Sequence, residues 1–326
     1  MVITLPNDLL NTLLAGERFL IFTHCRPDGD AIGSSFGLKT FLQDNGKYAD
    51  VVMPDSPPAR YSKFGLDHLQ SADPADYDRI VILDCASKER IAHGSSLTEE
   101  TFSGDMVFSL DHHITNNVNA RFSFVEAKAS SASEIVSALA FQSGLKVTAR
   151  AAEFWLSGML TDTGGFKFSN TTGDVLRSAA KLIDCGVDLE KLINILFFSK
   201  PARQLAFESD LASNYLKITC GGRFAYALIP PELLEKHSFS LKEDEGIIDI
   251  LREIDGTVIA MLIHKAPDGF KVSLRSKDPK YPVSPIASSF GGGGHLMAAG
   301  VTLNVPDFQT AEKVMLPKVS ELLGEC

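Results

Sequence analysis

Histidine and aspartate side chains cluster in the stretch FTHCRPDGDAIGSS, where His24, Asp28 and Asp30 fall within seven residues. Imidazole nitrogens and carboxylate oxygens bind Mn²⁺, Mg²⁺ or catalytic Zn²⁺, whereas a structural zinc site usually relies on paired thiolates. These aspartates also have an ordinary alternative role, because Asp30 could cap a helix that starts at Ala31. The stretch is therefore either an acidic turn or one part of a metal site.

Three other segments end in the same residue types. RIVILD ends at Asp84, DMVFSLD ends at Asp111 and continues into His112 and His113, and the helical pattern EFWLSGMLTD ends at Asp162. A single aspartate at such an end is usually a turn or cap residue. Carboxylates that several segments bring together would repel and raise each other's pKa, and bound metal ions would relieve that repulsion.

Two metal ions would use this set of ligands better than one. A pair about 3.5–4 Å apart stabilises an in-line displacement at phosphorus, and a water between the ions becomes acidic enough to act as the nucleophile. Asp84 stands alone at the end of its segment, and a carboxylate can bind one ion with each oxygen. We therefore expect Asp84 to bridge the two ions in a reaction at a phosphate ester.

The elements that must position these residues alternate along the first half of the chain. Apolar runs of strand length lie at 18–24, 48–54, 79–84 and 105–111, and helical patterns lie at 31–46, 131–144, 149–162 and 171–186. Strands that are apolar on both faces and alternate with helices indicate an α/β fold, a parallel sheet with helices on both faces. Ligands bind such sheets beyond the carboxyl ends of the strands, which is where the candidate ligands fall.

The sequence changes in character after about residue 197. A polar-faced helical segment is followed by two hairpin patterns that turn at Gly221–Gly222 and Pro267–Gly269, and then by a strand and a final helix. We expect residues 1–195 to form the metal-binding catalytic domain, 196–213 a helical linker, and 214–326 a smaller α+β substrate-binding domain. The active-site cleft is expected between the two domains.

The run GGGGH at residues 291–295 has two interpretations. Consecutive glycines cost backbone entropy in an ordered domain, so they form either a tight flexible loop or a cradle of backbone N–H groups for a phosphate. HLMAAG, which follows, resembles a short helix start whose N-terminus would also favour an anion. The run is not a Walker motif, because no GK[ST] follows it.

KVSLRSK at residues 271–277 alternates in the manner of a strand. Val272 and Leu274 fall on one face, and Ser273, Arg275 and Lys277 fall on the other. The polar face is either an ordinary solvated surface or a place where Arg275 grips a substrate phosphate with two hydrogen bonds.

Length, charge and cysteine content restrict the class of protein. The chain has 326 residues, which suggests two domains, and its formal net charge of −10 argues against a protein that coats long duplex nucleic acid. No apolar run in the sequence approaches the length of a membrane span. Five scattered cysteines without a CxxC pair indicate free thiols in a reducing compartment, so we expect a cytoplasmic protein.

Taken in order, these motifs resemble those of the DHH phosphoesterase superfamily. HCRPDGDAIGSS resembles its first motif, Asp84 in LDCAS its second, DHH at 111–113 its third and TDTGGF at 161–166 its fourth. GGGGHLMAAG resembles the nucleic-acid-binding domain called DHHA1. Within the superfamily the chain is most similar to the nanoRNase and pAp-phosphatase group. The resemblance spans nearly the whole chain, and five motifs in order are far more specific than any one of them.

The resemblance implies a role for each candidate residue. One Mn²⁺ would be held by His24, Asp28 and Asp84, and the other by Asp30, Asp84, His112 and Asp162, with Mg²⁺ or Co²⁺ as substitutes. Asp111 would orient a histidine from behind, and His113 would face the substrate phosphate or leaving group, so the catalytic set is His113, Asp84 and Asp111. Substrate would be held by Arg275, Ser276, Gly292, Gly293, Gly294 and His295.

The implied reaction is hydrolysis of very short oligoribonucleotides to nucleoside monophosphates by a water that two metal ions activate. Conversion of 3′-phosphoadenosine 5′-phosphate (pAp) to AMP would be a second activity. The implied partners are these short single-stranded substrates and a second copy of the chain in a homodimer, with neither long duplex nucleic acid nor a membrane. A linear or cyclic dinucleotide phosphodiesterase of the same superfamily is an alternative. A non-catalytic nucleotide or metal sensor is an alternative of another class, although a sensor would tolerate the loss of a ligand and none is lost here.

Overall fold

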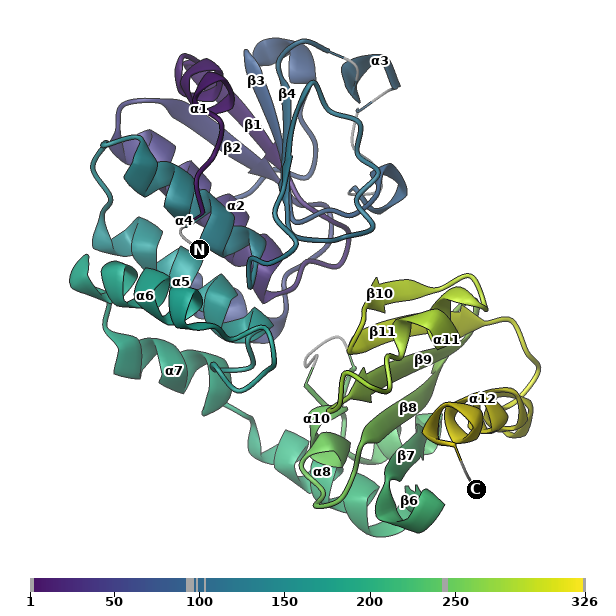
Figure 1. Cartoon of the computed structure of the whole chain (residues 1–326). Coiled ribbons are helices and arrows are strands. Elements are labelled where there is room, and N and C mark those ends of the chain that lie inside the picture. Colours follow the sequence, from purple (N-terminus) through teal and green to yellow (C-terminus); the bar gives the residue numbers. More distant parts are fainter. Residues whose placement is uncertain (1–2, 92–96, 98, 103, 242–245, 325–326) are drawn as a thin grey trace. The chain divides into compact units, whose positions relative to one another are not determined.

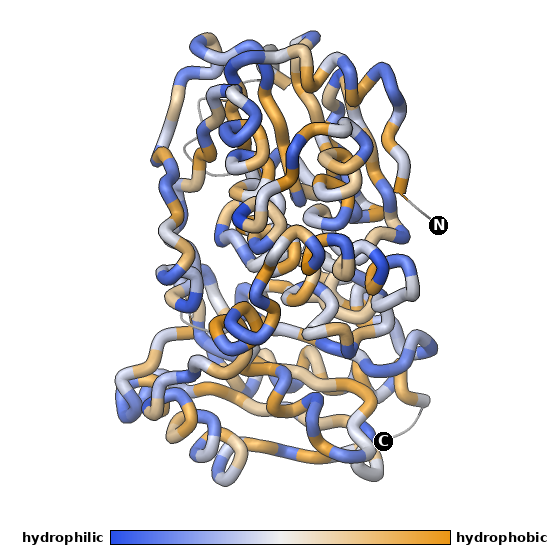
Figure 2. Tube along the Cα trace, turned by 90° about the vertical axis from the view of Figure 1, so that its left-hand side faces the viewer, coloured by the Kyte–Doolittle hydropathy of each residue, from blue (hydrophilic) through white to orange (hydrophobic). Residues whose placement is uncertain are grey.

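The computed structural model describes residues 3–91, 97, 99–102, 104–241 and 246–324 (Figure 1). The chain divides into two compact units, residues 1–199 and 200–326. Each unit has its own sheet and its own hydrophobic clusters. In each unit, hydrophobic segments run through the interior and hydrophilic segments lie toward the outside (Figure 2).

The described part of the first unit contains a five-stranded parallel sheet with the order β2-β1-β3-β4-β5. Its strands are β1 (Arg18–Phe22), β2 (Tyr48–Val52), β3 (Arg79–Leu83), β4 (Val107–Asp111) and β5 (Phe122–Val125). The four predicted strands are confirmed, each slightly shorter than expected. The sequence interpretation missed β5, an edge strand whose residues alternate between half-buried and exposed.

The direction of strand addition changes at β1. From β1 the sheet runs to β2 on one side and to β3, β4 and β5 on the other. In a sheet of this order, the space beyond the ends of β1 and β3 is the switch point at which ligands bind. His24 and Asp28 follow β1, and Asp84 follows β3, so all three lie at this switch point.

Helices gather on one side of this sheet. They are α1 (Asn7–Leu14), α2 (Gly29–Asp44), α4 (Ala132–Gln142), α5 (Ala149–Asp162), α6 (Gly173–Asp184) and α7 (Leu189–Phe197). They share one hydrophobic cluster with Phe19 and Val81 of the sheet. The opposite face, which includes Phe22 and Ile82, is covered by the short helix α3 (Glu99–Phe102) and by loop segments. Both faces are therefore covered, but helices dominate only one of them.

Close packing of α2 against α5 positions two of the candidate ligands. A Cβ atom at Gly33 of α2 would fall 2.6 Å from the carbonyl oxygen of Phe154. A Cβ atom at Gly158 of α5 would fall 2.8 Å from Oδ1 of Asp30. Neither position has room for a side chain, so glycine allows the two helices to approach. The approach brings Asp30, in the first turn of α2, toward Asp162 at the end of α5.

The described part of the second unit contains a six-stranded mixed sheet with the order β10-β11-β9-β8-β7-β6. Its strands are β6 (Leu216–Thr219), β7 (Phe224–Ile229), β8 (Ile259–Ala266), β9 (Gly269–Ser276), β10 (Gly293–His295) and β11 (Ala298–Leu303). β7 and β8 pair in parallel, and the other neighbours pair antiparallel. Both predicted hairpins are confirmed, as β6–β7 and β8–β9.

The two faces of the second sheet are covered differently. One face packs against α11 (Ser284–Ser288) and α12 (Phe308–Leu323). On the opposite face, α8 (Ala202–Asn214), α9 (Pro231–Lys236) and α10 (Asp249–Arg252) pack on β7 and β8. Among the described residues, the cluster on that opposite face includes none from β9, β10 or β11. The half of this face formed by β9, β10 and β11 therefore lies outside the cover that the described helices of the second unit provide.

Two local predictions are wrong. HLMAAG does not start a helix, because Gly293–His295 and Ala298–Leu303 pair as antiparallel strands on either side of a turn. The helix expected across residues 196–213 is interrupted, since α7 ends at Phe197 and α8 begins at Ala202, directly after Pro201. A residue that precedes proline disfavours the helical conformation, which explains the break.

The cysteines only partly follow expectation. Of those that the structure describes, Cys25, Cys85 and Cys185 are free thiols, whereas Cys220 forms a disulfide bond. The expectation of free thiols throughout is therefore wrong at Cys220. A membrane-crossing helix is not found among the described residues, since none is both long and apolar enough.

Candidate metal centre

Asp84 lies at the centre of the predicted cluster, directly after β3. Its side chain is buried, its Oδ2 lies 3.5 Å from Nε2 of His24, and its Oδ1 lies 3.5 Å from Nε2 of His112. The two oxygens of one carboxylate therefore face two different histidines. The backbone of Asp84 has a φ of +52°, a left-handed conformation that aspartate and asparagine tolerate better than most residues.

His24 and Asp28 form one side of the cluster, with Nε2 of His24 3.6 Å from Oδ1 of Asp28. The other ring nitrogen of His24, Nδ1, lies 2.9 Å from the carbonyl oxygen of Cys25. A carbonyl oxygen only accepts hydrogen bonds, so Nδ1 carries the proton and Nε2 keeps its lone pair toward the carboxylates of Asp28 and Asp84. Asp28 also caps α2, because its Oδ1 accepts hydrogen bonds from the backbone N–H groups of Asp30 and Ala31. The capping role considered for Asp30 belongs to Asp28.

Asp30, His112 and Asp162 form the other side of the cluster. Nε2 of His112 lies 3.8 Å from Oδ2 of Asp30 and 3.6 Å from Oδ2 of Asp162. The start of α4 holds Asp30 in place: Oδ2 accepts a hydrogen bond of 2.6 Å from the N–H of Ala132, and Oδ1 accepts one of 2.9 Å from the N–H of Ser133. The carboxylate of Asp30 therefore joins α2 to α4 in addition to facing the cluster.

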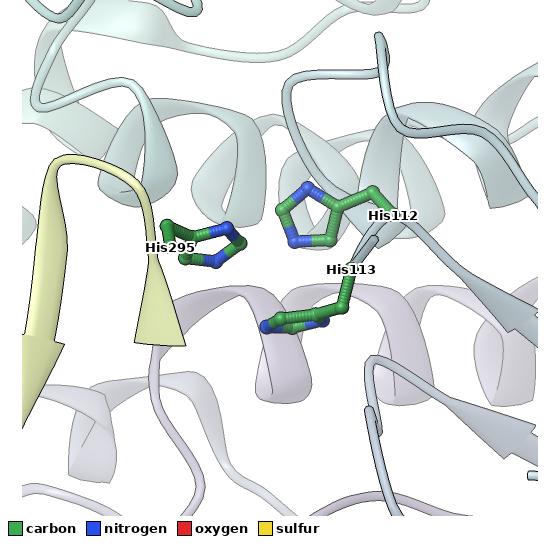
Figure 3. A group of neighbouring side chains, drawn as sticks. All are labelled: His112, His113 and His295. Atoms are coloured by element: carbon green, nitrogen blue, oxygen red, sulfur yellow. The ribbon is translucent and has the colours of Figure 1, made fainter. Parts of the chain in front are cut away.

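Asp111 and His113 form a hydrogen-bonded pair beside the cluster. Nδ1 of His113 donates a hydrogen bond of 2.7 Å to Oδ1 of Asp111, which also accepts one of 2.8 Å from the backbone N–H of His112. The rings of His112 and His113 come from the segment directly after β4, and their centroids lie 4.7 Å apart (Figure 3). Asp111 thus fixes the ring of His113 with Nε2 directed away from Asp111.

Asn116 was missed by the sequence interpretation. Its Nδ2 donates hydrogen bonds of 2.6 Å to Oδ2 of Asp111 and 3.1 Å to the carbonyl oxygen of Cys85. It lies in a loop and carries no charge, so neither periodicity nor ligand chemistry marks it in the sequence.

Asn170 was missed for the same reason. Its Nδ2 donates hydrogen bonds of 3.1 Å to the carbonyl oxygens of Ser130 and Asp162. Ser130 lies just before α4, whose first turn holds Asp30. Asn170 therefore connects the two segments that position Asp30 and Asp162.

The carboxylates of the cluster repel one another. Burial, together with the charge of Asp84, raises the pKa of Asp30 to about 7. Burial also raises the pKa of Asp162 well above its usual range, and attraction to His112 offsets this only in part. Burial acts in the same direction on Asp84, but contacts with His112 and His24 outweigh it and hold the pKa of Asp84 well below its usual range. The cluster therefore gathers more negative charge than its histidines balance.

The donor set fits divalent metal ions. Ligand atoms of His24, Asp28 and Asp84 lie within 4.8 Å of one another, and so do those of Asp30, His112 and Asp162. Two donors bound at about 2.1 Å to one ion lie roughly 3 to 3.5 Å apart, close to the histidine–carboxylate separations found here. Oδ1 of Asp84 is buried without a hydrogen-bond partner among the described residues, which is typical of a ligand atom. Carboxylate with imidazole suits Mn²⁺ or Mg²⁺ better than a structural zinc.

Arg275 and His295 lie in one row across the second sheet. Arg275 of β9 is opposite Ala298 of β11, and Ala298 is opposite His295 of β10, the strand that carries this histidine in Figure 3. Directly opposite residues of antiparallel strands point to the same face, and neighbouring strands are about 4.8 Å apart. Arg275 and His295 therefore flank the small Ala298 on the half of the face outside the helical cover.

Ser276 is not part of that row. It follows Arg275 on the opposite face of β9, it is 3% exposed, and its hydroxyl donates a hydrogen bond of 3.0 Å to the carbonyl oxygen of Asp278. The predicted alternation of this strand is confirmed, with Val272 and Leu274 buried. The structure therefore does not bring Ser276 together with Arg275.

The glycines of the run differ in what the fold requires of them. A Cβ atom would fall 2.3 Å from the carbonyl oxygen of Gly300 if placed at Gly292, and 2.4 Å from that of Ala298 if placed at Gly294. Close approach of the strands therefore requires these two glycines. A Cβ atom at Gly293 would meet no atom of the described residues within 4 Å, and Gly293 is not among the glycines with positive φ. The fold leaves room for a side chain at Gly293.

The sequence matches two family models. Residues 18–159 match the N-terminal domain of the DHH family, and residues 221–321 match the DHHA1 domain. A protein of Thermus thermophilus named bifunctional oligoribonuclease and PAP phosphatase NrnA is 33% identical over 93% of this chain and 89% of its own length. A protein of Bacillus subtilis with the same name is 27% identical over 92% of this chain and 93% of its own length.

Solved structures share the fold. The crystal structure of an exopolyphosphatase-related protein from Bacteroides fragilis is 25% identical, covers 98% of both chains and has a TM-score of 0.88. RecJ from Thermus thermophilus in complex with Mn²⁺ is 13% identical, covers 100% of this chain and 56% of its own, and has a TM-score of 0.55. The second likeness concerns the fold alone.

Proposed function

The chain is a phosphoesterase of the DHH family with a DHHA1 domain, and from this premise we propose that it hydrolyses very short oligoribonucleotides to nucleoside monophosphates and pAp to AMP. The observation that carries the proposal is the position of Asp84, whose two oxygens face His24 on one side and His112 on the other. Relatives that are named for both activities cover nearly the whole chain and support this choice of substrates.

The cluster would hold two Mn²⁺ ions, with Mg²⁺ or Co²⁺ as substitutes. One set of ligands is His24, Asp28 and Asp84, and the other is Asp30, Asp84, His112 and Asp162. When bound, such ions would supply positive charge to the phosphate oxygens and lower the pKa of the attacking water. The excess negative charge of the cluster supports this assignment, because divalent ions would neutralise it.

The remaining residues of the first unit would handle the proton and the leaving group. Nδ1 of His113 is held by Asp111, so Nε2 is the nitrogen that would donate a proton to the leaving oxygen. Asp111 is buried and accepts three hydrogen bonds, from His112, His113 and Asn116. Its role would therefore be to orient His113, not to bind an ion.

Arg275 and His295 of the second unit would bind a substrate phosphate. An arginine can hold a phosphate with two parallel hydrogen bonds, and only the small Ala298 lies between Arg275 and His295 in their row. Gly293 would permit close approach of the backbone, because the fold itself does not need a glycine there. The packing of the strands already explains why glycine stands at Gly292 and Gly294, so these two are weaker candidates for substrate binding. Ser276 is the weakest candidate because it is buried.

A short substrate suits an acidic protein. The formal net charge of −10 disfavours long nucleic acid, whereas a dinucleotide brings few phosphates, which two ions and one arginine can balance. That the chain acts as a homodimer in the cytoplasm stays a prediction.

The test is a substrate panel on protein stripped of metal with EDTA. Diribonucleotide, 5-mer and 24-mer RNA, pAp and a cyclic dinucleotide would each be incubated with Mn²⁺, Mg²⁺ or Co²⁺, and the products separated by chromatography. We expect turnover of the diribonucleotide and of pAp with Mn²⁺, weaker turnover of the 24-mer, and none before metal is added.

The other outcomes separate the alternatives. Faster cleavage of the cyclic dinucleotide would favour the dinucleotide phosphodiesterase. Binding of Mn²⁺ and nucleotide without turnover of any substrate would refute the proposal and leave the sensor.

A further inference from the structure

Asn116 uses its whole side-chain amide to join three segments of the first unit. Its two Nδ2 hydrogens go to Oδ2 of Asp111, at 2.6 Å, and to the carbonyl oxygen of Cys85, at 3.1 Å. Its Oδ1 accepts a hydrogen bond of 3.0 Å from the backbone N–H of Val118. An asparagine amide has two N–H donors and one carbonyl acceptor. Every group of this side chain is therefore engaged.

The contact with Cys85 supports the turn that carries Asp84. Asp84 has a φ of +52°, and non-glycine residues keep such a conformation only where their surroundings hold them in it. Asn116 binds the carbonyl oxygen of the next residue, and the backbone N–H of Asn117 donates a hydrogen bond of 2.9 Å to the carbonyl oxygen of Ala86. The loop of residues 113–118 therefore clamps the turn from which the central carboxylate projects.

The contact with Asp111 supports His113. Asp111 binds His113 through Oδ1 and Asn116 through Oδ2, so Asn116 limits rotation of the carboxylate that orients the imidazole. Nδ1 of His113 lies 3.6 Å from Oδ1 of Asp84. One side chain thus restrains both the turn at Asp84 and the ring beside it.

We propose that Asn116 is a positioning residue that fixes the carboxylate of Asp84 and the imidazole of His113 relative to each other. It contacts neither of the two sets of ligand side chains directly, and it acts through Asp111 and the backbone of Cys85. The expected effect on Mn²⁺ binding rests on the proposed metal site alone, whereas the expected effect on turnover rests also on the proposed substrates.

The experiment compares Asn116→Asp and Asn116→Ala with Asn117→Asp and Asn117→Ala. Asn116→Asp keeps the shape but replaces both donors with an acceptor that faces the carboxylate of Asp111, and Asn116→Ala removes the donors without adding charge. Asn117 is the matched control, because its side chain is exposed and its backbone N–H survives either substitution. Three quantities would be measured: Mn²⁺ affinity of the EDTA-stripped protein by calorimetry, kcat and KM for a diribonucleotide, and the unfolding temperature of the metal-free protein.

Both Asn116 variants should bind Mn²⁺ about 10- to 100-fold more weakly and lose a similar factor in kcat, while KM stays near that of the wild type. The Asn117 variants should match the wild type in all three. Mn²⁺ affinity and kcat within a few-fold of the controls would overturn the inference. A lower unfolding temperature with unchanged Mn²⁺ affinity would also overturn it, because it would show a purely structural role. If the wild type itself hydrolyses no diribonucleotide, the proposed function fails, and Mn²⁺ affinity still decides the role of Asn116.

Discussion

Oδ2 of Asp30 accepts a hydrogen bond of 2.6 Å from the backbone N–H of Ala132, a residue 102 positions further along the chain. Oδ1 of the same carboxylate accepts a hydrogen bond of 2.9 Å from the backbone N–H of Ser133. A side chain whose residue type suggests a metal ligand is therefore also an anchor for the first turn of α4. The two roles make opposite predictions for protein without metal, because removal of a ligand relieves repulsion, whereas removal of an anchor breaks hydrogen bonds.

Asp30→Asn should destabilise the metal-free first unit. An asparagine amide would accept a hydrogen bond from only one of the two backbone N–H groups of α4, and its own NH₂ would face the other. That second N–H would be left without an acceptor, and a buried unpaired donor costs about 1–3 kcal/mol. Relief of repulsion should be the smaller effect near neutral pH, since the raised pKa of Asp30 already leaves it partly protonated there. Denaturant unfolding of stripped protein would measure this, with the exposed Asp8→Asn as control. An increase in stability would mean that repulsion, not anchoring, dominates at Asp30.

Asp84→Asn should lower turnover by at least about 100-fold, more than the usual loss for a residue that only supports a ligand. Asparagine keeps the shape of the side chain and tolerates the left-handed backbone, so the fold should survive. Asp84→Ala should lose activity equally and also lose about 1–2 kcal/mol of stability, because alanine is strained at a φ of +52°. Diribonucleotide turnover and thermal unfolding would be measured together. Activity of Asp84→Asn within a few-fold of the wild type would refute the bridging assignment.

Arg275→Ala should raise KM for a diribonucleotide about ten-fold or more, the effect of losing a hydrogen bond to a charged group. Turnover of a small generic phosphoester with a single phosphate and no second nucleotide should change little. Lys271→Ala is the matched control, since Lys271 lies on the same face of β9 but not in the row of His295. Steady-state kinetics on both substrates would check the prediction, and equal losses on the two would argue against a binding role.

Gly293→Ala should leave the unfolding temperature of the protein unchanged, because the structure has room for a methyl group there. Gly292→Ala and Gly294→Ala should both lower it, since their methyl groups would collide with carbonyl oxygens of β11. If substrate approaches the backbone at Gly293, the methyl group should raise KM without affecting the fold. Calorimetry with kinetics separates the two effects. Wild-type KM in Gly293→Ala would remove this residue from the substrate site.

Asp210 should make the second unit less stable at low pH. Hydrogen bonds from Lys236, His237 and Asn214 hold the pKa of Asp210 well below its usual range. A carboxyl with a lowered folded pKa contributes stability above its unfolded pKa of about 3.9 and loses it as pH falls toward the folded value. Asp210→Asn should therefore lower the unfolding temperature at pH 7, and the difference from the wild type should shrink below about pH 4. Asp268→Asn, at an exposed turn, is the control, and a difference independent of pH would contradict the assignment.

Much of the first unit follows from its sequence. Apolar runs that alternate with helical patterns predict a parallel sheet, and the rule that ligands bind at the carboxyl ends of such strands brings His24, Asp84 and His112 to one edge. The sequence suggests Asp30 as a possible cap of the first long helix, whereas the structure has Asp28 as the cap, two residues earlier. Such a shift is typical of element boundaries read from a sequence, and here it exchanges the roles of two neighbouring carboxylates.

Other features could not be predicted because their cause lies far away along the chain. Asn116 and Asn170 are loop residues whose importance comes from carbonyl groups of distant segments. The strand β10 (Gly293–His295) pairs with β11 although glycine is unfavourable in strands. The carbonyl oxygens of β11 leave no room for a Cβ atom at Gly292 or Gly294, a constraint that the sequence near these glycines does not reveal.

The proposed ligands come from segments that begin at His24 and end at Asp162, so the cluster exists only once all of them have docked. A transition state for folding that lacks any one segment presents an incomplete set of ligands. Cations would therefore leave the folding rate nearly unchanged and would slow unfolding, since they stabilise only the completed native state. During synthesis, the set of Asp30, Asp84, His112 and Asp162 would stay incomplete until α5 had left the ribosome and packed on α2.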